Sequence, residues 1–290
     1  MSGKERVLRI GKIPYANLFP IYYYLERKCS HSSSARISNY KFIEGVPSRL
    51  NKMLRDGRLD VSPSSSIEYL RHKEKYSVIP WLSISSAGPA YSIFLFSSLP
   101  LDKLGGKRIA VSSQSETSRV LLKIILKNFY SLKCRFVVVR SGSIKKLLGS
   151  FPACLLIGDD ALKAYKKVKS SGLRVRSENQ TKNSELIYTY DLGELWFRHT
   201  GLPFIFALWI VRKKAISEKR ELVKRLLDDL IRAKKYVSQN LSLIARHAPQ
   251  RKWLGETELI DYWEGISYDF TESHLEGLLL FERYAKKLKI

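Results

Sequence analysis

R-I-G-K-I-P-Y-A-N-L, residues 9–18, is the stretch that decides how this chain begins to fold. It passes from apolar residues through Gly11 into a loop that ends at Asn17, and a second apolar segment begins at Phe19. This order predicts a strand, a loop and a helix. In an open α/β sheet, ligands bind at the carboxyl ends of the strands. Asn17 is therefore a candidate ligand-binding residue.

The composition is that of a folded protein with a strongly positive surface. The 290 residues are 44% hydrophobic and 11% aromatic, and the net charge is +24, from 51 Lys and Arg against 27 Asp and Glu. Such a field attracts anions in general, including nucleic acids and small dicarboxylates. The basic residues are spread along the chain as short pairs, and we find no nucleic-acid-binding motif, which favours a solvated basic surface.

Cysteine usage and hydropathy indicate the compartment. Three cysteines, Cys29, Cys134 and Cys154, cannot form a complete disulfide framework, which is typical of a reducing compartment. The N-terminus lacks the apolar region of a signal peptide, and no apolar window is long enough to span a membrane. We therefore expect a cytoplasmic protein without a membrane partner.

The first third of the chain alternates between strand and helix patterns. After the opening unit we expect a strand at 41–43, a helix at 46–55 and a strand at 59–61. The serine-rich residues 62–66 then form a loop into a helix that begins at Ile67. Ser65 and Glu68 have the spacing of a capping box, which predicts a polar helix N-terminus that attracts carboxylates.

A strand-like segment follows at 76–98, where serines alternate with apolar residues up to Ser85 and Ser86. The next unit is predicted as a strand at 107–111, a hydroxyl-rich loop at 112–118 and a helix at 119–130. Ser113 and Glu116 again have capping-box spacing. A buried strand at 154–158 then leads to Asp159, Asp160 and a helix at 161–168.

The last third should complete two lobes. A short helix should begin at Asp191 and end at Gly201, and residues 204–211 are apolar throughout, as in a strand buried on both faces. Amphipathic helices fill the remainder. We predict an α/β, two-lobed architecture of the type II periplasmic-binding-protein kind, with residues 1–97 and 204–290 in lobe 1, residues 98–203 in lobe 2, and an interlobe cleft lined by serines.

No familiar catalytic set is present. The five histidines lack metal-site spacing, and there is no nucleophile elbow or phosphate-binding loop. Ser143 and Lys146 match S-x-x-K, but that short pattern lacks its companion motifs. What remains is a set of polar side chains at predicted strand ends. Each alone is best explained as a loop or cap residue, but together they favour a polar cleft for a small carboxylate ligand: Asn17, Ser65, Ser66, Ser85, Ser86, Ser115, Thr117, Ser118 and Asp159.

Several longer motifs identify a family. They are G-K-I-P-Y-A-N at 11–17, the stretch V-P-S-R-L-N-K-M-L-R-D-G-R-L-D-V-S-P-S-S-S-I-E-Y at 46–69, S-I-S-S at 83–86, S-E-T-S at 115–118, L-L-I-G-D-D-A-L at 155–162 and D-L-G-E-L-W-F-R-H-T-G-L-P-F-I-F-A-L-W at 191–209. Together they resemble the chorismate dehydratases, the first enzymes of the futalosine route to menaquinone. The similarity runs nearly from end to end.

The resemblance implies a hydro-lyase that converts chorismate to 3-[(1-carboxyvinyl)oxy]benzoate and water, without a cofactor or metal. It implies that the substrate's own enolpyruvyl carboxylate acts as the base, while the protein orients the substrate. Asn17 matches the family's catalytic asparagine and Ser86 a carboxylate-binding serine. The other strand-end residues are expected to line the cleft, and the protein is expected to be a monomer or a homodimer.

Three other functions stay open at this point. The chain resembles, less closely, the sister enzyme that acts on cyclic dehypoxanthinyl futalosine. A non-catalytic binding protein for an aromatic or dicarboxylate ligand would share the two lobes. Nucleic-acid binding would explain the charge and predicts steeply salt-dependent association.

Overall fold

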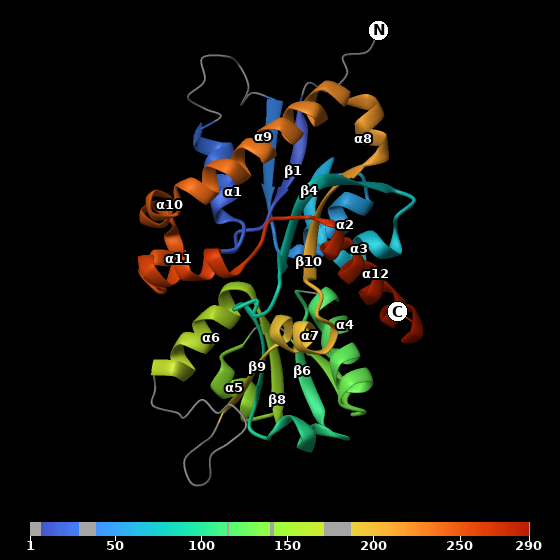
Figure 1. Cartoon of the computed structure of the whole chain (residues 1–290), viewed down its shortest axis with the longest axis vertical. Helices are drawn as coiled ribbons and strands as arrows, with labels where there is room; N and C mark the ends of the chain where they lie inside the picture. Colours follow the sequence, from blue (N-terminus) through green and yellow to red (C-terminus); the bar gives the residue numbers. More distant parts are fainter. Residues whose placement is uncertain (1–6, 29–38, 115, 140–141, 171–186, 290) are drawn as a thin grey trace. The chain divides into compact units, whose positions relative to one another are not determined.

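The computed structural model describes residues 7–28, 39–114, 116–139, 142–170 and 187–289. The chain divides into two compact units. Unit 1 comprises Met1–Ser85 and Ile205–Thr271, and unit 2 comprises Ser86–Phe204 and Glu272–Ile290. Each unit contains one five-stranded sheet with helices packed against it (Figure 1). The predicted α/β class is therefore confirmed.

The sheet of unit 1 has the strand order β2-β1-β3-β10-β4. Its strands are β1 (Leu8–Lys12), β2 (Tyr40–Glu44), β3 (Val61–Ser65), β4 (Tyr76–Ser86) and β10 (Phe204–Arg212). Strands β2, β1 and β3 are parallel, and β10 is antiparallel to β3. The Lys213 N–H donates to Lys75 O at 3.0 Å, so β4 starts where β10 ends. It follows that β1, β3 and β4 end at the same edge of the sheet.

Within the described residues, unit 1 has seven α-helices. They are α1 (Phe19–Tyr23), α2 (Pro47–Arg55), α3 (Ser66–Arg71), α8 (Lys213–Glu218), α9 (Arg220–Gln239), α10 (Leu241–His247) and α11 (Glu256–Gly265). Helix α1 contacts α9 and α10. Its Tyr22 ring packs against Trp209 of β10, with ring centroids 5.8 Å apart, and the Tyr22 hydroxyl donates to Gly11 O. The core of unit 1 thus ties the opening strand–loop–helix unit to β10.

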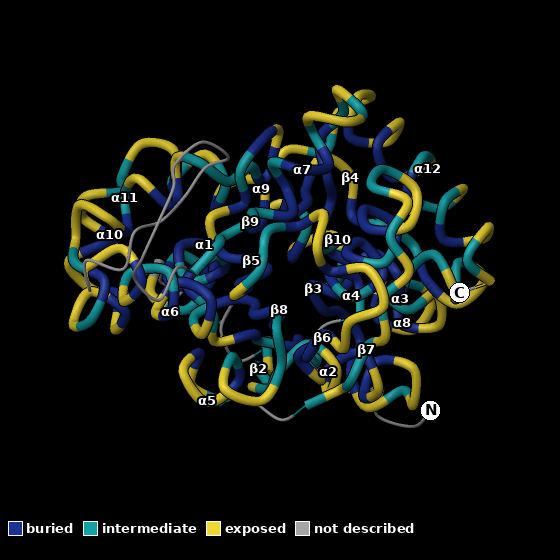
Figure 2. Tube along the Cα trace, turned by 90° about the horizontal axis from the view of Figure 1, so that it is seen from below, coloured by how far each residue is buried: buried dark blue, intermediate teal, exposed yellow. Residues whose placement is uncertain are grey.

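One difference from prediction concerns the serine-rich segment. Residues 62–66 were expected to form a loop after a strand at 59–61, but β3 runs from Val61 to Ser65 and every residue in it is buried (Figure 2). Serine composition is typical of turns. Here most of these serines belong to strand β3 instead, which lies between β1 and β10. A Cβ at Gly11 of β1 would collide with Ser62 Oγ, so a small side chain must face a glycine at this point.

The sheet of unit 2 has the strand order β7-β6-β8-β5-β9. Its strands are β5 (Ile93–Ser97), β6 (Arg108–Ser112), β7 (Arg135–Val139), β8 (Ala153–Ile157) and β9 (Tyr188–Asp191), and its helices are α4 (Glu116–Ile124), α5 (Ile144–Leu148), α6 (Gly158–Ser170), α7 (Leu192–Thr200) and α12 (Glu272–Lys287). Strands β6, β7 and β8 are parallel, whereas β5 is antiparallel to both neighbours. The carboxyl ends of β6, β7 and β8 therefore share one edge.

The division of the chain differs from the predicted boundaries in two places. Strand β5 pairs with β8 and β9, so residues 86–97 belong to unit 2 and not to the first lobe. Helix α12 also belongs to unit 2, because Phe281 packs on Phe204 with ring centroids 5.0 Å apart and lies close to Trp196. The amphipathic pattern predicts that α12 covers a core, but it carries no information about which core.

Candidate functional site

The loop that carries Asn17 is held by two aromatic side chains from much later in the chain. Trp263 of α11 donates its Nε1–H to Ala16 O at 2.8 Å, and the Tyr268 hydroxyl donates to Asn17 O at 2.7 Å. The Trp263 ring also stacks on Phe19, with an interplanar angle of 10°. Burial, and then the nearby Tyr262, raises the pKa of Tyr268, so its hydroxyl stays a donor. The backbone of this loop is therefore fixed from two directions.

The Asn17 main-chain carbonyl has a hydrogen-bond donor, but its side-chain oxygen, Oδ1, does not have one among the described residues. This Oδ1 is buried. A buried acceptor without a donor costs about 1–3 kcal/mol. Asn17 lies in the loop between β1, which ends at Lys12, and α1, which begins at Phe19, and an α/β sheet offers a ligand site in such a loop. We interpret the unpaired oxygen as an acceptor for a donor that a ligand supplies.

The predicted site serines of unit 1, Ser65, Ser66 and Ser85, lie at the same sheet edge as Asn17, and their hydroxyls have protein partners. Ser65 accepts from Asn51 Nδ2 at 3.0 Å, and Ser66 donates to Ile205 O. Ser85 donates to Ser267 O at 3.2 Å, in the segment next to Tyr268. These three predicted site residues are thus brought to one edge, where their hydrogen bonds also connect β3, β4 and β10 to neighbouring elements.

The capping box predicted for Ser65 and Glu68 is wrong. Ser65 is the N-cap of α3 but forms no side-chain cap bond. Glu68 is buried and pairs instead with Arg55, and it accepts from the Tyr76 hydroxyl at 2.9 Å. The spacing is correct for a cap, but two long-range partners take the carboxylate. Tertiary contacts have overridden a local signal.

Ser86 lies where the turn at Gly88 packs closely against Gly193, at the start of α7. Its hydroxyl donates to Gly88 O at 2.9 Å, and a Cβ at Gly193 would lie 2.7 Å from Ser86 Oγ and 2.6 Å from Gly88 O. Gly193 belongs to the first turn of α7, and the Asp191 carboxylate caps that helix. The predicted limits of this helix, Asp191 and Gly201, are confirmed by the N-cap and by the positive φ of 69° at Gly201.

Asp191 joins two segments of unit 2. Its carboxylate accepts from the N–H groups of Ala90 and Tyr91 at 2.9 and 2.7 Å, in addition to those of Gly193 and Glu194 at the start of α7. Burial raises the pKa of Asp191 to about 6, and the four N–H donors oppose that rise. The turn that follows Ser86 is therefore anchored to the N-terminus of α7.

Three more of the predicted residues, Thr117, Ser118 and Asp159, lie at the carboxyl edge of the second sheet. Thr117 and Ser118 are buried in the first turn of α4, and Asp159 lies in the first turn of α6. Helix α4 begins at Glu116 and not at the predicted residue 119. Ser115 lies outside the described residues. The structure therefore groups these side chains with the ends of β6 and β8, as the sequence predicts.

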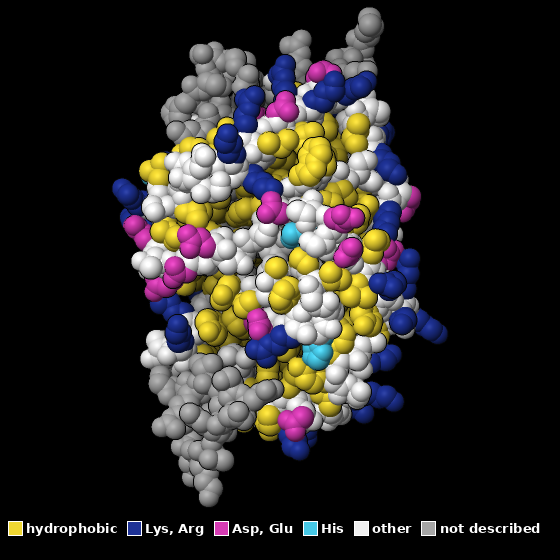
Figure 3. All heavy atoms as spheres, viewed as in Figure 1, with side chains coloured by type: hydrophobic (Ala, Val, Ile, Leu, Met, Phe, Trp, Pro, Cys, Tyr) yellow, Lys and Arg dark blue, Asp and Glu magenta, His cyan; other side chains and the backbone are white. Residues whose placement is uncertain are grey.

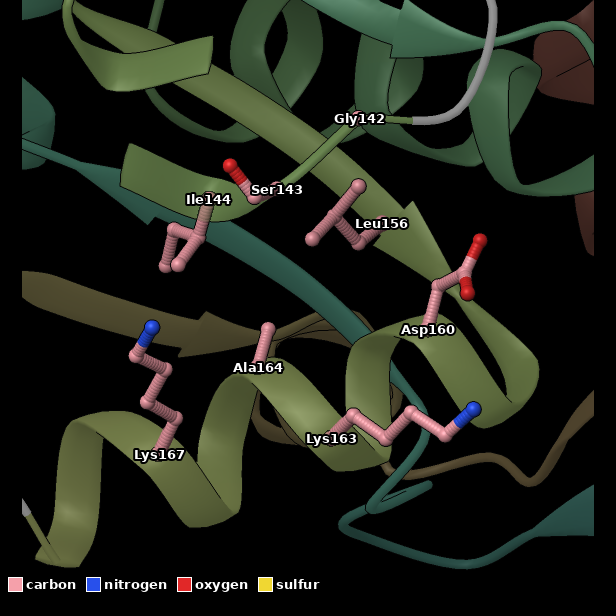
Figure 4. Close-up of a pocket in the computed structure, with 8 residues that line it drawn as sticks. All are labelled: Gly142, Ser143, Ile144, Leu156, Asp160, Lys163, Ala164 and Lys167. Carbon is pink, nitrogen blue, oxygen red and sulfur yellow. The ribbon is translucent and has the colours of Figure 1, made fainter. Parts of the chain in front are cut away.

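A cavity of about 340 Å³ opens beside α6 (Figure 4). Asp160, rather than Asp159, lines it, and Lys163 and Lys167 lie toward its two ends, with Ser143 opposite. Sequence reasoning missed both lysines, although their spacing of four residues in a helix places them on the face of Asp160. Ser143 Oγ accepts the N–H of Lys146 at 3.3 Å, so the S-x-x-K spacing serves as an N-cap of α5.

The described part of the chain shows neither a metal site nor, on the face drawn in Figure 3, a concentrated basic patch. No group of three His, Cys, Asp or Glu side chains in that part could hold a metal ion. On the face shown in Figure 3, Lys and Arg side chains are scattered over many elements rather than gathered in one patch. No helix within the described ranges is long and apolar enough to cross a membrane.

Comparison with known proteins identifies the family. A family model described as menaquinone biosynthesis matches residues 8–287. A chorismate dehydratase of Thermus thermophilus is 33% identical over 205 residues, which cover 71% of this chain and 70% of that one. A chorismate dehydratase of Campylobacter jejuni is 29% identical over 231 residues, which cover 79% and 78% of the two chains.

Solved structures establish the fold. An Archaeoglobus fulgidus protein superposes with a TM-score of 0.74 at 17% identity, covering 99% of both chains. A Candida albicans protein described as having the generic periplasmic-binding-protein fold superposes with a TM-score of 0.66 at 12% identity, covering 97% of this chain and 89% of that one. The chain thus has the periplasmic-binding-protein fold and belongs to the menaquinone biosynthesis family.

Proposed function

We propose that this protein is a chorismate dehydratase, which converts chorismate to 3-[(1-carboxyvinyl)oxy]benzoate and water in futalosine-dependent menaquinone biosynthesis. Family membership and two relatives of that name support the proposal. The observation that carries it is that the buried Oδ1 of Asn17, in the loop after β1, has no hydrogen-bond partner within the described part of the chain. The proposed enzyme is a carbon–oxygen lyase.

The reaction does not require a strong acid or base from the protein. The ring C–H beside the enolpyruvyl ether breaks, its electron pair forms the new ring double bond, and the neighbouring C–O bond breaks as the hydroxyl leaves. The proton and the hydroxide together make one water molecule, so atoms and charge balance. Because the ring becomes aromatic, the product is strongly favoured. The proposed base is the enolpyruvyl carboxylate of the substrate itself.

Asn17 has a defined task in this scheme. A carboxylate has no proton to donate, whereas the chorismate hydroxyl does, so we assign the hydroxyl as the donor to Asn17 Oδ1. The Asn17 amide N–H groups then face substrate oxygens as donors. This pair of interactions holds the leaving group and the carboxylate in one orientation. Holding the base against the ring proton makes proton transfer intramolecular, an effect that supplies roughly 7–11 kcal/mol.

The aromatic clamp on the loop supports this assignment. Trp263 and Tyr268 hold the carbonyls of Ala16 and Asn17, so the Asn17 side chain starts from a fixed backbone. A side chain on a fixed backbone loses less conformational entropy when the substrate binds than one on a mobile backbone. It therefore orients the substrate at a lower cost in free energy. Trp263 and Tyr268 are thus positioning residues, which act on the reaction through Asn17.

The other predicted residues stay assigned to substrate binding. Ser65, Ser66 and Ser85 lie at the Asn17 edge of unit 1, and Ser86 follows Ser85 in the chain. Ser115, Thr117, Ser118 and Asp159 are further predicted residues of unit 2. We propose that the hydroxyl groups of these two serines and of Thr117 contact the substrate carboxylates, and that Asp159 is a further substrate-binding residue. The strongly positive charge of the protein favours the approach of a dianionic substrate.

Incubation with chorismate tests the proposal. Purified protein should convert chorismate to a product with an aromatic absorbance, smaller by one water molecule, and the rate should scale with protein concentration. The same assay with cyclic dehypoxanthinyl futalosine should leave that compound unchanged. Binding of chorismate without turnover would identify a non-catalytic binding protein, and turnover of the futalosine derivative alone would identify the sister enzyme.

A further inference from the structure

A second concave feature lies in unit 1 at the sheet edge opposite Asn17. A pocket of about 260 Å³ is lined by the end of α2, the start of β4 and the junction of β10 with α8. The start of β4 marks the amino edge of the parallel strands, whereas Asn17 follows the carboxyl end of β1. The proposed dehydratase site does not use this pocket.

The lining of this pocket is almost entirely cationic. Five of its seven lining residues are basic, and the other two are Leu54 and Tyr76: the basic residues are Arg55, Lys75, Arg212, Lys213 and Lys214. They come from three separate segments of the sequence, so no single charged run explains their meeting. Arg55 and Lys214 have carboxylate partners in Glu68 and Glu218. The like charges on the other three side chains repel one another across the cavity, and an anion between them would remove that repulsion.

Two of these cations are rigidly placed. Arg212 Nη1 donates to Gly57 O at 3.1 Å, and its guanidinium packs where a Cβ at Gly57 would lie. Arg55 pairs with Glu68, a carboxylate that is only 1% exposed. Burial, and then the Glu68 carboxylate, raises the pKa of Tyr76, so its hydroxyl stays protonated. The back of the pocket is therefore ordered before any ligand binds.

The three lysines that line the pocket are all exposed. Lys75 and Lys213 form no ion pair with any residue in the described ranges. Lys214 lies 3.7 Å from Glu218, at an exposed position where such a pair contributes little. The Lys213 N–H donates to Lys75 O at 3.0 Å, so the two lysines start from adjacent points of the main chain. Both line the pocket, Lys75 from just before β4 and Lys213 from just after β10.

We propose that this pocket binds a phosphate-bearing anion, of the size of a phosphate or diphosphate group. Arg212 and Arg55 form an ordered cationic wall, and Lys75 and Lys213 close on the anion from the solvent side. Arginine and lysine together are the usual ligands of phosphate oxygens. The ligand is either a soluble phosphate compound or the headgroup of an anionic phospholipid, since both present the same chemistry.

Titration calorimetry of the full chain with pyrophosphate and with inorganic phosphate, at low ionic strength, tests the proposal. The double variant Lys75→Gln/Lys213→Gln removes two charges from the pocket. The matched control, Lys224→Gln/Arg225→Gln, removes two exposed charges from α9 in the same unit. We expect pyrophosphate affinity to fall at least about tenfold in the pocket variant and less than about twofold in the control.

A second arm distinguishes the sources of the phosphate. Vesicles of phosphatidylglycerol, with phosphatidylcholine vesicles as the blank, should bind the protein only if a lipid headgroup is the ligand, and that binding should fall in the pocket variant. Binding of pyrophosphate alone identifies a soluble ligand. The proposal is overturned if neither probe binds, or if both double variants lose affinity equally. None of these measurements involves chorismate, so their outcome is independent of the proposed dehydratase.

Discussion

Replacing Asn17 with alanine should change stability and activity in opposite directions. The Asn17 Oδ1 has no hydrogen-bond partner among the described residues, so the free protein carries an uncompensated desolvation cost of about 1–3 kcal/mol at this oxygen. Alanine removes that cost together with about 1 kcal/mol of side-chain contacts. The free energy of unfolding should therefore stay constant or rise by up to about 2 kcal/mol.

The effect on turnover should be large. If Asn17 orients the leaving hydroxyl and the carboxylate of chorismate, its loss should lower kcat by about 10²- to 10³-fold, the size seen when one preorganised hydrogen-bonding group is removed from an active site. The Ala16 and Asn17 carbonyls keep their partners, because Trp263 and Tyr268 bind the main chain. The variant loop should thus keep its backbone position.

Urea unfolding and steady-state chorismate turnover measure the two effects on the same preparation. Asn240→Ala is the control, because Asn240 Nδ2 donates to Tyr236 O at 2.8 Å and its side chain has a protein partner. That variant should lose about 0.5–1.5 kcal/mol of stability and keep its turnover. A destabilised Asn17→Ala variant that turns over chorismate at the wild-type rate would refute the reasoning.

Three further changes test the surroundings of the site. Tyr268→Phe removes one hydroxyl that holds the Asn17 carbonyl, and should lower kcat about tenfold with little change in KM in steady-state kinetics. Asp60→Asn leaves the buried Lys219 ammonium, 2.9 Å away, without its carboxylate, and should cost about 3–5 kcal/mol in urea unfolding. Gly193→Ala forces a Cβ against Gly88 O, and should destabilise the protein by about 1–3 kcal/mol, measured by thermal unfolding.

Asp60 also sets a pH dependence. Burial raises its pKa, but the hydrogen bonds from Arg9 and Lys219 outweigh burial, and the net pKa is lowered. The stability from this group is therefore present above the ordinary carboxyl pKa and is lost as the pH falls through the lowered value. Below about pH 4, wild-type protein should lose stability relative to Asp60→Asn. Parallel pH profiles of the two proteins would contradict this assignment.

The other two changes have their own controls. Gly105→Ala places a Cβ 3.6 Å from Leu132, an ordinary contact, so it should leave the melting temperature nearly unchanged. Equal effects of Gly193→Ala and Gly105→Ala would mean that the close approach at Ser86 is not constrained. For Tyr268→Phe, a rise in KM at constant kcat would show that the hydroxyl serves binding and not orientation.

The sequence predicts the position of Asn17 but not what holds it. A strand, a loop and a helix can be read from local hydrophobic order, and β1 and α1 confirm that reading around Asn17. The donors from Trp263 and Tyr268 come from the far end of the chain. Hydrophobic periodicity indicates that such aromatic residues are buried. It does not indicate which distant residues they contact.

The errors have the same physical origin. Residues 62–66 have the composition of a turn, and only their neighbours Gly11 and β10 show that small polar side chains are required inside a sheet. Glu68 has the spacing of a cap, yet Arg55 and Tyr76 compete for its carboxylate. In each case a tertiary partner decides between two locally acceptable structures.

Whether this protein dehydrates chorismate can be measured by product analysis. Wild-type protein and Asn17→Ala are each mixed with chorismate, and the products are followed by mass spectrometry. We expect 3-[(1-carboxyvinyl)oxy]benzoate from the wild-type protein, with formation at least about 10²-fold slower in the variant. If the wild-type protein leaves chorismate unchanged, it is not a chorismate dehydratase.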